Sequence, residues 1–139
     1  MKKYFIFLIL AMLSSCDNDD NNDLSSQNNL TGRWNWIITS GGFGGGSQTP
    51  EKLNQTRIIE FSGNSLKTYL NGNLSMIQKF SIQNKPSPFG GEQKVIVIDK
   101  ENSITNEVYI GWSFEIIGNK LYLREECADC YTSEYERIK

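Results

Sequence analysis

From Leu30 onward, apolar and polar residues alternate in short runs that are rich in β-branched and aromatic residues. A period of two is typical of strands whose two faces meet different surroundings. The pattern predicts eight strands, at Leu30–Thr39, Thr56–Ser62, Ser65–Asn71, Leu74–Gln83, Gln93–Asp99, Glu107–Ile117, Lys120–Glu125 and Tyr131–Ile138. No segment has a sustained helical period, although Thr49–Asn54 could hold one helical turn after Pro50.

Short turn signals separate these strands. Gly63-Asn64, Asn71-Gly72-Asn73 and Gly118-Asn119 supply residues that tolerate the positive φ of tight hairpins. Consecutive hairpins without long crossovers favour an up-and-down meander, and closing the sheet would remove its exposed edges. We therefore expect an all-β fold, an up-and-down antiparallel barrel of eight strands.

Alternation also predicts which side chains face the interior. Trp34, Trp36 and Ile38 share one face of the first strand, and the same period selects aromatic residues in later strands. Because an eight-stranded barrel is just wide enough to be filled or to hold a small ligand, these side chains could do either. The candidate ligand-binding residues are Trp36, Ile38, Phe61, Phe80, Trp112 and Phe114, with Phe43 above them.

Phe43 belongs to the segment Ser40–Ser47, which is otherwise glycine and serine. The segment does not match a phosphate-binding loop, since no Gly-Lys-Ser/Thr follows it. Two interpretations remain open. The segment is a plain flexible connection, or it is a lid over the barrel mouth with Phe43 as its apolar contact.

The N-terminal residues have the pattern of an export signal. Lys2 and Lys3 precede the uncharged run Tyr4–Leu13, which is far shorter than the ~18–20 residues that cross a bilayer. Leu13-Ser14-Ser15-Cys16 then resembles the bacterial lipobox. We expect residues 1–15 to be a lipoprotein signal peptide, with Cys16 lipidated and anchored to a membrane. An ordinary secretory signal or a buried core strand is the alternative.

The segment Asp17–Asn29 has Leu24 as its only apolar residue, so it cannot offset its ordering entropy by burial. We expect residues 16–29 to form a flexible tether and residues 30–139 to form the barrel domain. The acidic cluster Asp17–Asp23 resembles export tags of surface lipoproteins in Bacteroidetes-like bacteria, although a solvated spacer has the same composition. The expected location is the outer membrane of the cell envelope, on its periplasmic face or on the cell surface.

Composition limits the function classes. The net charge of −2 without a basic block argues against nucleic acid as a partner. The chain has no histidine, which removes the commonest general base and metal ligand and any Ser-His-Asp or Cys-His arrangement. We therefore expect neither an enzyme, nor a cofactor, nor a metal site.

Gly32-Arg33-Trp34, at the start of the first strand, is similar to the Gly-x-Trp signature of lipocalins. The resemblance implies that Gly32 lets the chain turn under the barrel floor and that Trp34 plugs the closed end. It also implies that a basic residue late in the barrel, Arg137, stacks across Trp34. Residues 30–139 look like the small lipocalin-like lipoproteins of Bacteroidetes, although the chain is shorter than typical secreted lipocalins.

Cys127 and Cys130 lie between the last two predicted strands. A redox Cys-x-x-Cys favours a helix N-terminus after a strand, and a zinc site would need two further ligands. The ends of a turn are close enough for a disulfide, which an oxidising compartment would form. We favour a structural disulfide over free thiols and over a redox or metal site.

Two functions from different classes follow. The first is a membrane-anchored monomeric binding module that holds a small apolar or amphipathic molecule, which requires a cavity of at least ~300 Å³ above Trp34. The second is a surface interaction or structural module whose barrel is packed and which exposes an apolar patch.

Overall fold

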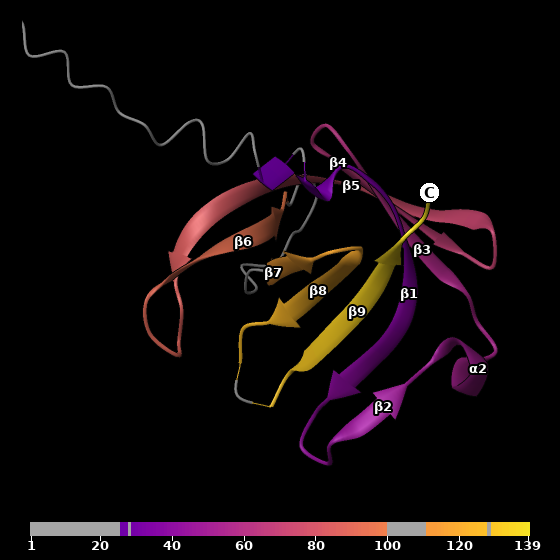
Figure 1. Cartoon of the computed structure of the whole chain (residues 1–139), viewed down its shortest axis with the longest axis horizontal. Helices are drawn as coiled ribbons and strands as arrows, with labels where there is room; N and C mark the ends of the chain where they lie inside the picture. The colour runs from indigo at the N-terminus through magenta and orange to yellow at the C-terminus, as the bar shows by residue number, and fades with distance from the viewer. Residues whose placement is uncertain (1–25, 28, 100–110, 128) are drawn as a thin grey trace, which may run out of the picture.

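The computed structural model describes residues 26–27, 29–99, 111–127 and 129–139. Its strands are β1 (Gly32–Gly41), β2 (Gly46–Gln48), β3 (Arg57–Ser62), β4 (Ser65–Leu70), β5 (Asn73–Pro86), β6 (Glu92–Ile98), β7 (Gly111–Ile117), β8 (Lys120–Glu125) and β9 (Tyr131–Arg137). They form one antiparallel sheet in the order β2-β1-β3-β4-β5-β6-β7-β8-β9. Because β1 also pairs with β9, eight of these strands close into a barrel (Figure 1).

The predicted fold class, an all-β up-and-down barrel, is confirmed. Each predicted strand has a counterpart, and β8 has the predicted bounds. The helix α2 (Pro50–Leu53) forms where one turn was expected: the Thr49 side chain accepts a hydrogen bond from Lys52 N, and Asn54 ends the helix in the left-handed region. The short strand β2 was not predicted; it forms because the glycine-rich segment folds back on β1.

The first strand begins two residues later than predicted, because Leu30 belongs to a helical turn. Residues 26, 27, 29 and 30 are helical, and both Thr31 N and Thr31 Oγ1 donate to the Gln27 carbonyl oxygen. Leu30 is fully buried, and its carbonyl oxygen accepts a 2.8 Å hydrogen bond from Trp34 Nε1. This turn therefore covers one end of the barrel.

Arg137 also covers Trp34 at this closed end of the barrel. Its guanidinium carbon lies 4.0 Å from the centre of the Trp34 ring, and its Nη1 donates to the Thr31 carbonyl oxygen at 2.8 Å. Gly32 has φ +125°, and a Cβ there would lie 2.9 Å from Arg137 Nη1. Glycine at this position thus leaves the space that the guanidinium occupies.

A β-bulge in β1 corrects the prediction for Ile38. Trp36 pairs with Tyr135 and Ile38 pairs with Glu134, so the strand has one extra residue between them. The extra residue reverses the alternation, and Thr39 rather than Ile38 shares the inner face with Trp36. Ile38 therefore cannot line the interior.

The packed core fills the half of the barrel next to the closed end. Phe61 and Phe80 meet edge to face there, with ring centres 5.2 Å apart. The most deeply buried members of this cluster are Leu30, Trp34, Trp36, Phe61, Phe80, Ile96 and Leu121; four further members, Ile59, Leu66, Leu123 and Tyr135, also line the cavity. No helix among the described residues is long and apolar enough to cross a membrane. The predicted signal peptide, Cys16 and most of the predicted tether lie outside the described residues.

Candidate ligand-binding cavity

A cavity of about 520 Å³ occupies the other half of the barrel. Its walls are the inward faces of most barrel strands, and β2 adds Gln48 at the rim. The apolar side chains that line it are Ile59, Leu66, Leu70, Met76, Trp112 and Leu123. The barrel is thus packed at one end and hollow at the other.

Strand directions define the two ends. β1 runs from Gly32 at the closed end to Gly41 at the mouth, and β9 runs back from Tyr131 to Arg137. Figure 1 shows the first described residues, in indigo, at the opposite side of the molecule from the β1–β2 and β8–β9 turns. The chain therefore leads into the barrel at the end away from the mouth.

Hydroxyl groups line the cavity wall where β1 meets β9. Trp36 Nε1 donates to Thr39 Oγ1 at 2.9 Å, and the Thr39 and Ser133 hydroxyl oxygens are 2.7 Å apart. The Tyr135 hydroxyl also interacts with the Ser133 side chain. These contacts hold the polar atoms of this wall in a connected network, which fixes their positions.

Arg57 is the cationic side chain of the cavity. Arg57 is two residues before Ile59 and four before Phe61, so all three side chains lie on the inner face of β3. Its guanidinium carbon is 4.9 Å from the centre of the Trp36 ring. The guanidinium also lies near enough to the Tyr135 hydroxyl to lower the pKa of Tyr135 through its charge and hydrogen bonding. Within the described part of the chain, no carboxylate forms an ion pair with Arg57.

The Tyr135 side chain is buried beside this guanidinium. Burial raises the pKa of Tyr135 above its ordinary value of 10.0, and the charge and hydrogen bond of Arg57 and the Ser133 hydrogen bond act in the opposite direction. Burial is the largest of these effects. Tyr135 is therefore a neutral phenol at physiological pH and presents a hydroxyl to the cavity.

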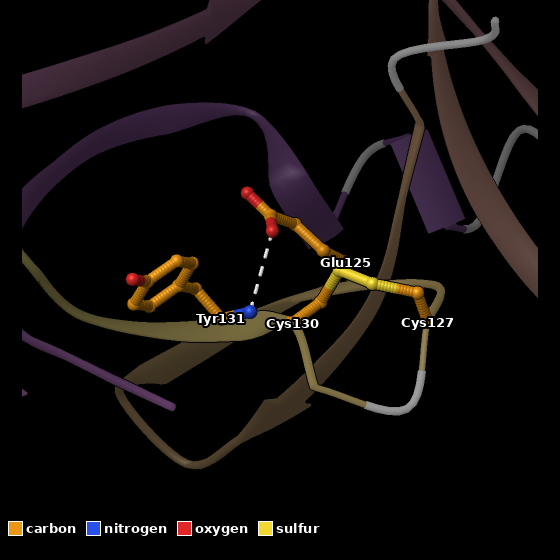
Figure 2. Close-up of a disulfide and its surroundings, with 4 residues drawn as sticks. All are labelled: Glu125, Cys127, Cys130 and Tyr131. Atoms are coloured by element: carbon orange, nitrogen blue, oxygen red, sulfur yellow. Dashed lines mark hydrogen bonds between the residues drawn. A yellow bond between two sulfur atoms is a disulfide. The ribbon is translucent and has the colours of Figure 1, made fainter. Parts of the chain in front are cut away.

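Glu125 and the disulfide turn lie at the mouth. Cys127 and Cys130 are joined in a disulfide with their Cα atoms 5.2 Å apart, as expected for a structural bond (Figure 2). Just before this turn, Glu125 lines the cavity, and its Oε2 accepts a hydrogen bond from Tyr131 N at 3.3 Å. A Cβ at Gly41 would lie only 2.3 Å from the Cys130 carbonyl oxygen, so the turn packs directly on the end of β1.

The predicted ligand-binding residues divide between core and cavity. Trp112 lines the cavity and also packs against the core cluster. Trp36, Phe61 and Phe80 are buried in the packed half, and Phe114 packs against the same cluster. Phe43 is 97% exposed at the tip of the β1–β2 turn, so its side chain does not cover the mouth in this structure.

The sequence pattern placed Tyr135 among the interior aromatic residues, but Arg57, Ser133 and Thr39 were missed. Arg57 is two residues from Ile59 and four from Phe61, and Ser133 is two residues from Tyr135, so each pair shares a face of its strand. This period of two was the available signal, but only apolar and aromatic positions were selected from it. Thr39 could not be found in this way, because the bulge changes its face.

The described residues contain no group of three or more His, Cys, Asp or Glu side chains placed to hold a metal ion. Comparison of the chain with protein-family models, with curated proteins and with solved structures finds no match. The cavity and its lining therefore carry the functional argument.

Proposed function

We propose that this protein binds a small amphipathic or apolar molecule in the open half of its barrel. The cavity of about 520 Å³ is the observation that carries the proposal. It exceeds the ~300 Å³ lower limit of typical small-molecule pockets. Leucine, isoleucine and methionine side chains supply an apolar wall, while the Arg57–Tyr135 side supplies polar atoms that orient a ligand.

We further propose that the protein is a monomeric lipoprotein of the lipocalin-like type, anchored to the outer membrane through Cys16. The lipobox and the Gly32-Arg33-Trp34 signature support this proposal. The position of the first described residues at the closed end is consistent with it, since an N-terminal anchor would leave the mouth accessible. The anchored protein would face the periplasm or the cell exterior.

A surface interaction module that does not use the cavity is the second candidate. It is favoured by Leu74 and Ile77, which are 52% and 59% exposed on β5. Their strand partners are Tyr69 and Lys67, so both lie on the outer face of the barrel. Such a module would have no need of the cavity, whereas a ligand-binding barrel requires it.

Native mass spectrometry of the protein, purified from cells that express the full chain, tests the proposal. We expect a reproducible adduct of a few hundred daltons. Gln78→Trp, which places a large side chain inside the cavity, should abolish the adduct. Ile77→Trp is the matched control, because it adds the same side chain one residue away on the outer face. A bare mass, with no stabilisation by a panel of lipids, would instead support the interaction module.

A further inference from the structure

We infer that the ligand carries a single carboxylate head group, which is held by Arg57 inside the cavity. This inference rests on the proposed function and specifies its ligand class. It starts from the guanidinium that lines the cavity and for which the described residues supply no carboxylate partner. A charged group within a half-enclosed site is costly to desolvate unless an opposite charge joins it.

The geometry around Arg57 positions its donors. One face of the guanidinium lies over the Trp36 ring at 4.9 Å, which restricts the plane of the group. A guanidinium has five N–H donors, and the contact with the Tyr135 hydroxyl uses only part of them. The remaining donors form a planar fork that matches the two oxygens of a carboxylate.

Neighbouring hydroxyls can complete the head-group site. Tyr135 and Ser133 line the cavity beside Arg57, and Thr39 lies 2.7 Å from Ser133. A neutral phenol can donate a hydrogen bond to a carboxylate oxygen. The wall therefore offers one positive charge and several neutral donors.

The charge balance favours a monoanion over a phosphate monoester. Arg57 is the only Lys or Arg side chain among the described residues that line the cavity, and Glu125 contributes a carboxylate at the mouth. A phosphate monoester carries nearly two negative charges at neutral pH, which one guanidinium cannot balance. A single carboxylate matches the site better.

Apolar side chains adjoin Arg57 inside the cavity. Arg57 pairs with Leu70, whereas Ile59 and Leu66 lie nearer the closed end, where Phe61 pairs with Leu66 and Gly32. An alkyl chain attached to the head group would therefore have apolar wall to lie along. Ile59, Leu66, Met76 and Trp112 supply that wall.

The test compares three twelve-carbon probes on the full-length protein by isothermal titration calorimetry: dodecanoate, dodecan-1-ol and dodecyl phosphate. We expect dodecanoate to bind about 10- to 100-fold more tightly than the alcohol, the range of a charge-assisted hydrogen bond. Dodecyl phosphate should bind no more tightly than dodecanoate. Equal binding of acid and alcohol would overturn the inference and leave the proposed function standing, whereas no binding of any probe would overturn both. Tighter binding of the phosphate would overturn the carboxylate assignment.

Two variants test whether Arg57 causes the preference for the acid. Arg57→Gln should remove the preference for the acid while the affinity for the alcohol is kept. Glu125→Gln should increase the preference for the acid over the alcohol, because it removes a negative charge from the same cavity. An acid preference that persists in folded Arg57→Gln would overturn the assignment to Arg57. If Arg57→Gln does not fold, the comparison of probes on the natural protein still decides the question.

Discussion

At the scale of single residues, two arginines stack on two tryptophans of β1, with different surroundings. Arg137 lies over Trp34 and donates to the backbone carbonyls of Asn29 and Thr31, so it is committed to the closed end. Arg57 lies over Trp36 and lines the cavity. We therefore interpret the first stack as structural and the second as part of a binding site.

Gly32→Ala should destabilise the closed end. The residue has φ +125°, and a Cβ would approach Arg137 Nη1 to 2.9 Å. We expect the free energy of unfolding to fall by about 1–3 kcal/mol, measured by urea denaturation. Gly44→Ala is the control, because nothing lies within 4 Å of a Cβ there. Equal stability of the two variants would contradict the proposed role of Gly32.

The buried phenol of Tyr135 predicts an alkaline loss of stability. Its pKa is raised in the folded protein, chiefly by burial, so the folded state keeps a proton that the unfolded state releases above the ordinary value of 10.0. The resulting stabilisation is complete below that pH and is lost as the pH rises through the folded pKa. Urea denaturation at a series of pH values above 10.0 should therefore show that the free energy of unfolding falls more steeply with pH in the natural protein than in Tyr135→Phe. Parallel profiles would show that Tyr135 ionises normally.

At the scale of elements, the bulge in β1 decides which residues reach the cavity. It places Thr39 inside, where it accepts from Trp36 Nε1, and places Ile38 opposite Glu134. The bulge therefore positions the hydroxyl wall on which the proposed head-group site depends.

Substitutions on the two sides of the bulge test this register. Thr39→Val leaves Trp36 Nε1 without its acceptor and should lower the free energy of unfolding by about 1–3 kcal/mol. Ile38→Lys should cost less than about 1 kcal/mol, since the new charge faces Glu134 on the outer surface. Chemical denaturation of both variants distinguishes the two faces. Unfolding of Ile38→Lys would indicate that Ile38 points inward.

The disulfide turn between β8 and β9 should make a modest contribution to stability. Its loop is short, so the chain-entropy model predicts a loss of about 2 kcal/mol when the bond is removed. Thermal unfolding with and without a reductant measures this loss. The double variant Cys127→Ser/Cys130→Ser provides the control, because its unfolding should not respond to the reductant. If the unfolding temperature of the natural protein also does not change with the reductant, the disulfide does not stabilise the fold.

At the scale of the whole molecule, the strands and their closure were predictable because alternation and turn residues act locally. Depth inside the barrel was not predictable. Trp36 and Trp112 have the same inward orientation, yet Trp36 belongs to the packed core and Trp112 lines the cavity. The period of two reports the face of a strand, whereas height along the barrel axis depends on register and tilt.

The barrel has a packed half and a hollow half, and methyl NMR during titration with dodecan-1-ol distinguishes the two. The methyl groups that should shift are those of Ile59, Leu66, Leu70, Met76 and Leu123. Those that should stay fixed are in the packed residues Leu30, Ile96 and Leu121. The predicted result is saturable shifts confined to the first set. Shifts confined to the outer-face residues Leu74 and Ile77, or no shifts at all, would contradict a ligand-binding cavity.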